Sequence, residues 1–260
     1  MDFAAKEVEV KVGARQLVVR LLRHTPHPEN TVAASAHLCY SPAGVHEIEG
    51  HLTPERREDL IALLLRSGHH TPLEHAVFTF GVEGISRACL AQLTRHRIAS
   101  FSVQSQRWVG KTSAGSTDGV FDYIVPPRIA ELGPEYVAEF ERQMRQIQEW
   151  YDFWYRALGA NREAREDARF VLPNAAETKL VVTMNARELH HFFSLRCCNR
   201  AQWEIRNLAE AMLRLVKGVA PALFRNAGPR CLRGPCPEGK LGCGKAAEVR
   251  ARYGVDAADG

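Results

Sequence analysis

The chain of 260 residues contains 45% hydrophobic and 25% charged residues, proportions typical of a soluble globular protein with one substantial core. Its net charge of +4 is too small to indicate a broad nucleic-acid footprint, and no apolar run of about 18 residues is present to span a membrane. The first residues lack the basic and apolar parts of a secretory signal, so we expect a cytoplasmic protein without nucleic-acid or membrane partners.

The first half of the chain carries signals for three strands and two helices. A helix is predicted to begin at Pro54 and end at Gly68, because Thr53 is a suitable N-cap and Pro is favoured in a first turn. Alternating or continuous apolar runs predict strands over residues 8–12, 17–21 and 76–82. A second helix is predicted over residues 85–95, with one face formed by Ile85, Ala88, Cys89 and Gln92.

The second half is predicted to be mainly helical. Asn161 is the expected N-cap of a short helix that Pro173 stops, and Asn185 caps another helix, with Glu188 completing a capping box. Residues 201–216 are predicted to form a last helix, and residues 120–125 and 178–184 to form strands. The longest helix has an apolar seam typical of a core or a subunit contact, formed by Val137, Phe140, Met144, Ile147, Tyr151, Trp154 and Leu158.

These elements predict a single α+β domain in which a small antiparallel sheet packs against long helices. We place this domain at residues 1–228 and a C-terminal tail containing Gly, Pro and Cys at residues 229–260. Residues 95–119 are polar and lack sustained periodicity, so we expect an extended loop there. A loop of that length inside a compact domain is usually functional.

The part of this loop that carries chemistry is residues 95–107, which contain three arginines, one histidine, three serines and two glutamines. Arginine forms paired, charge-assisted hydrogen bonds with phosphates, and glutamine can both donate to and accept from a pyrimidine edge. Alternatively, arginines that follow a helix complement its C-terminal dipole and stay solvated. Because so few acids are nearby to pair with the arginines, we favour a nucleotide-binding segment.

This segment resembles the signature of flavin-dependent thymidylate synthases. Arg95-His96-Arg97 is followed, after seven residues, by Ser105 and Arg107. The similarity covers most of residues 8–225, and further segments resemble that family in the same order: Gly68–His75, Leu172-Pro173, Asn185–Arg187, Leu195-Arg196 and Ala201–Ile205.

The resemblance implies an FAD site. FAD carries a pyrophosphate and, when reduced, an anionic ring, both of which fixed cations stabilise. The family binds FAD without a Rossmann fingerprint, and no G-x-G-x-x-G occurs in this chain. The family's FAD contacts correspond to Thr71, Arg95, His96, Arg97, Ile98, Asn185, Arg187, His191, Leu195 and Arg200.

The resemblance also implies a dUMP site. Arg107 and Ser105 would hold the phosphate or sugar, and Arg169 and Arg196 would clamp the pyrimidine, where a cation stabilises the activated ring. The family's dUMP contacts correspond to Gln92, Gln104, Ser105, Gln106, Arg107, Arg169 and Arg196. Arg196, Ser105 and His69 are therefore the catalytic candidates, with His69 as a proton carrier or, alternatively, a surface histidine after a helix end.

The implied reaction is reductive methylation of dUMP to dTMP, with methylenetetrahydrofolate as carbon donor and FAD, reduced by NADPH, as hydride carrier. A homotetramer with active sites shared between subunits is implied as well. The resemblance also implies that no protein cysteine acts as nucleophile, and Cys197 and Cys198 have no clear base partner in the sequence. Two rival functions are a flavoprotein with another nucleotide substrate and a non-catalytic RNA- or nucleotide-binding protein.

Two positions depart from the family pattern. Val103 stands where some members carry glutamate, and Arg200 stands where some carry histidine. The contacts expected at these two positions are therefore open.

The seven cysteines are an odd number, which argues against a complete disulfide framework. Cys231, Cys236 and Cys243 lie close together in the tail, but a structural zinc site normally has four ligands. A zinc ion or a cluster would need a fourth ligand from elsewhere, such as another subunit. The alternative is a loose tail with incidental or oxidatively paired thiols, and we predict no metal site.

Overall fold

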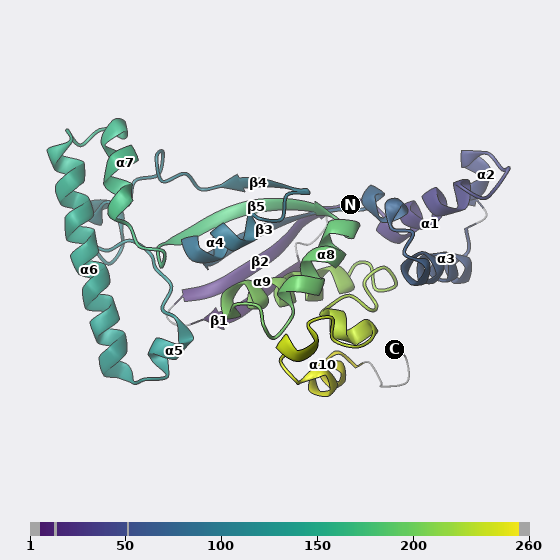
Figure 1. The fold of residues 1–260 in the computed structure, drawn as a ribbon. Coiled ribbons are helices and arrows are strands. Elements are labelled where there is room, and N and C mark those ends of the chain that lie inside the picture. Colours follow the sequence, from purple (N-terminus) through teal and green to yellow (C-terminus); the bar gives the residue numbers. More distant parts are fainter. Residues whose placement is uncertain (1–5, 13–14, 51, 255–260) are drawn as a thin grey trace.

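One antiparallel sheet forms the centre of the protein (Figure 1). The computed structural model describes residues 6–12, 15–50 and 52–254. The strand order is β1-β2-β3-β5-β4, with bounds β1 Lys6–Val12, β2 Arg15–His24, β3 Val77–Ser86, β4 Ala99–Val103 and β5 Glu177–Asn185. The central pair β3/β5 places Phe80 opposite Val182. The predicted small antiparallel sheet is confirmed.

Helices lie beyond both ends of this sheet and along one side of it. Figure 1 shows α1 to α3 beyond one end, α5 to α7 beyond the other, and α8 to α10 along one side. Their bounds are α1 Pro28–Leu38, α2 Val45–Gly50, α3 Pro54–Ser67, α4 Arg87–Leu93, α5 Pro127–Ala130, α6 Pro134–Ala157, α7 Arg162–Ala168, α8 Ala186–Arg196, α9 Trp203–Lys217 and α10 Ala246–Tyr253. Short 3₁₀ helices are η1 Thr71–His75, η2 Ser113–Gly115, η3 Arg169–Val171, η4 Arg230–Arg233 and η5 Gly239–Leu241. The predicted α+β class is therefore confirmed.

One face of the sheet packs on α4 and α9 and forms the main core. Alternate strand residues such as Val19, Phe80 and Val182 are fully buried there. The opposite face stays accessible to solvent, with Val181 still 39% exposed. An antiparallel sheet commonly has one buried and one accessible face, and the accessible one is available for a partner.

Side-chain caps start the helices where the sequence predicted them. Thr53 accepts a hydrogen bond from the Arg56 backbone N–H at 3.3 Å, and Gly68 ends α3 with φ of 74°. Asn161 and Asn185 accept from the N–H groups three residues later in the same way. The capping-box prediction for Glu188 is wrong, because its carboxylate binds His96 instead of the Asn185 N–H.

Two predictions about extended structure are wrong. The expected loop over 95–119 contains β4, whose Ser100 and Ser102 face outward while the alternate residues are half-buried. The expected strand over 120–125 forms only a single bridge, Tyr123 to Ala176. Val120, Phe121 and Tyr123 pack with residues of α6, and the Phe121 N–H donates to the side chain of Gln148 at 2.8 Å rather than to a strand.

Two helix boundaries also differ from the prediction. Ile85 belongs to β3, and α4 begins at Arg87 because Ser86 caps it by accepting from the Cys89 N–H at 3.0 Å. The last predicted helix begins at Trp203 rather than at residue 201, with the Gln202 side chain as its cap. Gln92, the predicted site residue on the first of these helices, still lies in α4.

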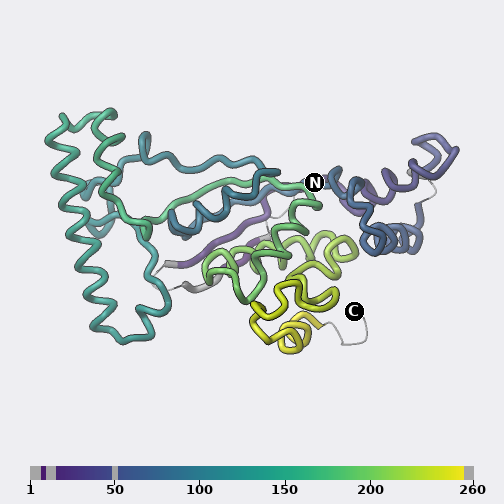
Figure 2. Tube along the Cα trace, viewed as in Figure 1, coloured from purple at the N-terminus to yellow at the C-terminus, as the bar shows by residue number. Residues whose placement is uncertain are grey.

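The long helix α6 stands apart from the sheet and has its own small core (Figure 2). Met144 and Tyr151 of the predicted seam are buried. Further along the same seam, Trp154 and Leu158 remain 47% and 42% exposed. The seam therefore serves as core in its middle and leaves apolar surface at its C-terminal end.

The described part of the predicted tail contains η4, η5 and α10. Cys231, Leu232 and Val249 form a small cluster there, and Tyr253 donates to Glu210 of α9 at 3.1 Å. Residues 1–5 of the predicted domain and 255–260 of the tail lie outside the described residues, and the boundary at residue 228 stays a prediction. Within the described residues, no helix combines the length and the apolar character needed to cross a bilayer.

Candidate active site

A pocket of about 710 Å³ lies where residues 95–98 meet α8. The turn after α4, in which the His96 N–H donates to Leu93 at 3.1 Å, directs His96 inward and leaves Arg95 and Arg97 exposed. On α8, Arg187, His191 and Leu195 recur every four residues and so share one face. The lining consists of His70, Glu74, Arg95, His96, Arg97, Ile98, Asn185, Arg187, Glu188, His190, His191, Ser194, Leu195, Arg196 and Arg233.

A hydrogen-bonded chain of three side chains forms the floor of this pocket. Arg196 donates from Nε to Nε2 of His96 at 3.0 Å, and Nδ1 of His96 lies 3.0 Å from a carboxylate oxygen of Glu188. Because an arginine can only donate, Nε2 must accept, and the proton sits on Nδ1 and is donated to Glu188. His96 is therefore a neutral imidazole in one tautomer, held between a cation and an anion.

The surroundings of this chain keep His96 neutral. Burial, together with the nearby Arg196 and His191, lowers the pKa of His96 to about 4. Burial raises the pKa of Glu188, which His191 partly opposes. At neutral pH the imidazole therefore carries no charge.

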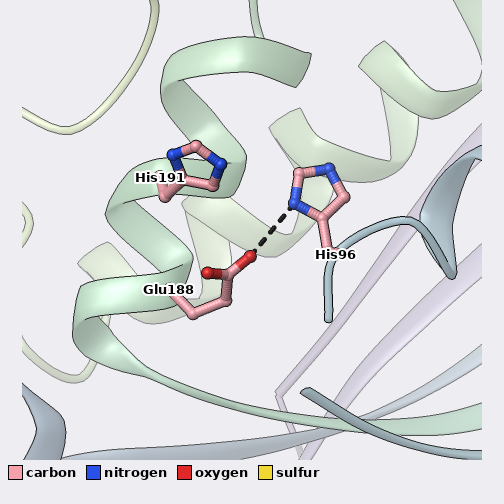
Figure 3. Close-up of side chains that lie close together, drawn as sticks. All are labelled: His96, Glu188 and His191. Atoms are coloured by element: carbon pink, nitrogen blue, oxygen red, sulfur yellow. Dashed lines mark hydrogen bonds and ion pairs between the residues drawn. The ribbon is translucent and has the colours of Figure 1, made fainter. Parts of the chain in front are cut away.

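The same three-residue neighbourhood could be mistaken for a metal site. Figure 3 shows His96 and Glu188 joined by a hydrogen bond, with His191 beside them on α8. The possible ligand atoms of His96, Glu188 and His191 all lie within 4.8 Å of one another. Both ring nitrogens of His96 are already engaged, however, and the Arg196 cation would repel a metal ion. We therefore interpret the group as a hydrogen-bond network.

The pocket has an excess of positive charge. Five arginines line it against two glutamates: Glu74 forms an ion pair with Arg187, and Glu188 accepts a hydrogen bond from the neutral His96. Among the described residues, Arg95, Arg97 and Arg233 form no ion pair with a carboxylate. Burial lowers the pKa of Arg196 and of Arg233, and a neighbouring arginine adds to this in each case. A bound anion would relieve both costs.

A second group of predicted residues lies around Glu166 of α7. Arg107 forms an ion pair with Glu166, and Arg169 donates from Nε to the Glu166 backbone carbonyl at 3.0 Å. Ser105 accepts from the Arg107 N–H at 3.2 Å. None of these three residues lines the first pocket, so one chain holds the predicted dUMP residues in two places.

Comparison with known proteins decides the family. The model of the family described as "Thymidylate synthase complementing protein" matches residues 20–222. A flavin-dependent thymidylate synthase from Geobacter sulfurreducens is 55% identical over 235 residues, which is 90% of this chain and 97% of that protein. One from Clostridium tetani is 47% identical over 247 residues, covering 90% and 96% of the two chains. The chain belongs to the flavin-dependent thymidylate synthase family.

A solved structure agrees with this fold. The UMP/dUMP methylase PolB from Streptomyces cacaoi, bound with 5-Br dUMP, superposes with a TM-score of 0.68 at 25% identity. The match covers 80% of this chain and 93% of that one.

The pocket of this flavin-dependent thymidylate synthase family member collects most, but not all, of the predicted FAD residues. It contains eight of them: Arg95, His96, Arg97, Ile98, Asn185, Arg187, His191 and Leu195. Thr71 begins η1, next to the pocket residue His70, and Arg200 instead lines a separate pocket beside the tail cysteines.

The remaining predicted residues are distributed around the pocket. Arg196 lines it and approaches the Gln92 carbonyl at 3.5 Å, whereas Gln104 lines a shallow pocket on the accessible sheet face. Gln106 is half-buried in the turn after Ser105. His69 is exposed, with its Nδ1 3.4 Å from the Tyr40 hydroxyl. In one chain, therefore, Arg196 is the one catalytic candidate in the pocket lining.

Sequence reasoning missed several lining residues. Glu188 could have been found, because it lies three positions before His191 and so shares its side of α8. His70 and Glu74 lie within the segment that resembles the family, but nothing in their pattern distinguished them from their neighbours. Arg233 comes from the tail, and no sequence pattern relates it to Arg196.

Proposed function

We propose that the chain converts dUMP to dTMP by reductive methylation, with methylenetetrahydrofolate as carbon donor and FAD, reduced by NADPH, as hydride carrier. The observation that carries this proposal is the pocket between residues 95–98 and α8, with five arginines against two glutamates. The names of the relatives support a flavin cofactor, and the dUMP methylase neighbour supports dUMP as substrate.

The residues of the pocket fit a flavin nucleotide. Its volume of about 710 Å³ falls within the range of about 300–1,000 Å³ usual for ligand sites. Arg95, Arg97 and Arg187 would hold the anionic parts of FAD, with Ile98 and Leu195 as apolar contacts. When bound there, the reduced flavin supplies the hydride, a chemistry that no protein side chain provides.

Arg196 is the residue for which we propose a role in transition-state stabilisation. His96 accepts its Nε–H and Glu188 fixes His96 in turn, so the guanidinium is held in one orientation. A guanidinium fixed beforehand stabilises negative charge on a pyrimidine without reorganising during the reaction. Because His96 is neutral, it accepts the Arg196 N–H and does not repel the guanidinium as a second cation would.

The cysteines support a mechanism without a thiol nucleophile. Burial raises the pKa of Cys89 and raises that of Cys197 to about 12, so both thiols stay protonated near neutral pH. Cys198 lines the other pocket, together with the tail. The flavin pocket has no cysteine in its lining among the described residues.

Active sites shared between subunits of a homotetramer would unite the two groups of predicted residues. Ser105, Arg107 and Arg169 lie around Glu166, outside the flavin pocket of the same chain. Phe170 beside Arg169 is 82% exposed, and Trp150 and Phe153 of α6 are 51% and 56% exposed. Apolar surface of this kind is typical of a region that a partner covers.

The deciding experiment measures tritium release from dUMP labelled at the carbon that gains the methyl group, with folate donor and NADPH, with and without FAD. Flavin-dependent release accompanied by dTMP supports the proposal. FAD binding without release favours a flavoprotein that acts on another nucleotide. Salt-dependent RNA binding without flavin would favour the non-catalytic alternative.

A further inference from the structure

Four cysteines line a second pocket, of about 450 Å³, next to the first. Cys198 comes from the turn after α8, and Cys231, Cys236 and Cys243 come from the tail. The sequence showed three clustered thiols without a fourth ligand, and the fold of this same chain supplies it.

The four cysteines come from two separate parts of the chain and line the same pocket. All four are free thiols in the structure. Thiolates packed together in this way repel one another unless a metal compensates their charge.

We propose that Cys198, Cys231, Cys236 and Cys243 bind an iron–sulfur cluster. Four thiolates are the ligand set that such clusters take. The proposal replaces the prediction of no metal site, and it does not require dUMP turnover.

The spacing of the sulfurs favours a cluster over a single ion. Tetrahedral zinc with Zn–S bonds of about 2.3 Å places its sulfurs about 3.8 Å apart. Among the described residues, only His96, Glu188 and His191 form a group of three whose ligand atoms all lie within 4.8 Å of one another, so no three of these sulfurs are that close. This spacing is wider than one tetrahedral zinc ion requires, whereas a polynuclear cluster accepts thiolates that are farther apart.

The charges around this pocket suit an anionic centre. Arg196, Arg200, Arg230 and Lys245 line it, against the single acid Glu238, which pairs with Arg200. Four thiolates on a cluster carry net negative charge, which these cations offset. The negative charge of a cluster would also explain why Arg200 lines this pocket rather than the first one.

The local fold is built around the cysteines rather than around an apolar core. Only Cys231, Leu232 and Val249 are buried in its own cluster. Arg250 holds the loop by donating to the Cys231 and Gly234 carbonyls, each at 2.8 Å. A Cβ on Gly242 would lie 3.2 Å from the Cys236 sulfur, so glycine lets the chain pass close to that thiol. Small lobes with so little apolar core commonly depend on a metal.

The two pockets are adjacent. Ser194, Leu195 and Arg196 line both of them, and Arg233 reaches from η4 into the first. A cluster that holds the tail in place would therefore also hold Arg233 at the edge of the first pocket.

The test is to purify the full chain without oxygen and to measure iron, acid-labile sulfide and zinc. We expect about two or four irons per chain with matching sulfide, and visible absorption from thiolate-bound iron. Cys198→Ser should lose this iron, whereas Cys39→Ser, at an exposed cysteine outside the pocket, should keep it. One zinc per chain without iron, or no iron even after anaerobic reconstitution with ferrous iron and sulfide, would overturn the proposal.

A second measurement does not depend on the folding of variants. The native chain is alkylated before and after removal of iron by a chelator, and the modified cysteines are identified by mass spectrometry. We expect Cys198, Cys231, Cys236 and Cys243 to react only after iron removal, and Cys39 to react in both states. Alkylation of exposed Cys243 in the iron-loaded protein would contradict its role as a ligand.

Discussion

Arg196 donates from Nε to Nε2 of His96 across 3.0 Å, and this single contact determines what the histidine can do. With Nε2 accepting and Nδ1 donating to Glu188, neither ring nitrogen is available to shuttle a proton. His96 is thus a positioning residue, fixed between α4 and α8, and Arg196 is the group it presents to the pocket.

If Arg196 acts on the pyrimidine as proposed, Arg196→Ala should reduce turnover by about 10²- to 10³-fold, because it removes a prearranged cation. FAD content should change little, because Arg95, Arg97, Arg187 and Arg233 remain in the pocket. Tritium release and bound-flavin absorbance measure the two effects separately. Arg66→Ala, at an exposed position on α3, is the control. Equal losses of flavin and turnover would refute the proposal that Arg196 serves the substrate while the other four arginines serve FAD.

Stability should fall as the pH is lowered from 7 to 5.5. The pKa values of His96 and His190 are lowered to about 4, mainly by burial, whereas an unfolded histidine titrates at about 6.5. The unfolded chain therefore binds more protons between these values, and the free energy of unfolding decreases with falling pH. We expect a loss on the order of 1 kcal/mol from buried His190 at pH 5.5, and less from His96, which borders the pocket.

The experiment is restricted to pH 7 to 5.5, because buried carboxyl groups affect the free energy of unfolding in the opposite direction as the pH falls. Burial raises the pKa of Glu188 and Glu204, which stabilises the folded state as the pH falls through their folded values. Urea unfolding at pH 7 and 5.5 is therefore compared for the wild type, His190→Gln and the exposed control His46→Gln. An unchanged pH dependence in His190→Gln would show that His190 is not the cause.

The elements that the sequence predicted correctly are those whose signals are local. Thr53 and Gly68 determine the ends of α3 through their own backbone and side-chain geometry. The error over 120–125 has a long-range cause, because Phe121 is buried against α6 and its N–H is bound by Gln148. Strand β4 was missed because its outward serines resemble loop composition, although β5 provides its hydrogen-bonding partner.

The candidate site likewise combines parts with local sequence signals and parts that depend on long-range contacts. The Arg95–Ile98 segment and one face of α8 could be predicted, because each is continuous or periodic in sequence. The arrangement of Arg196, His96 and Glu188 could not, since it depends on a contact between residues about a hundred positions apart. Cys198 likewise joins the tail cysteines only through the fold.

Glu204→Ala should destabilise the protein by about 2–4 kcal/mol, because it leaves buried donors unpaired. The Glu204 carboxylate accepts from both the N–H and the hydroxyl of Ser86, each at 2.6 Å, and so joins α9 to the junction of β3 and α4. Glu204→Gln should lose less, since its amide oxygen can still accept. Chemical denaturation measures both, with Glu163→Ala, whose side chain is 71% exposed, as control. A change within about 0.5 kcal/mol for Glu204→Ala would mean that this junction does not depend on the carboxylate.

Mixing two inactive variants should restore activity if Arg97 and Arg107 meet only between subunits. Arg97 lies in the pocket between residues 95–98 and α8, whereas Arg107 is paired with Glu166 outside it, so each variant would damage a different part of the proposed shared site. Arg97→Ala and Arg107→Ala are produced separately, then mixed, dissociated and reassembled at equal amounts. About a quarter of the sites would then carry both arginines intact, so we expect up to about a quarter of wild-type activity. Arg97→Ala mixed with Arg187→Ala is the matched control, because both arginines lie in one chain's pocket and no hybrid subunit regains both. Recovery in the control, or none in the first mixture despite mixed oligomers in native mass spectrometry, would contradict sites shared between subunits.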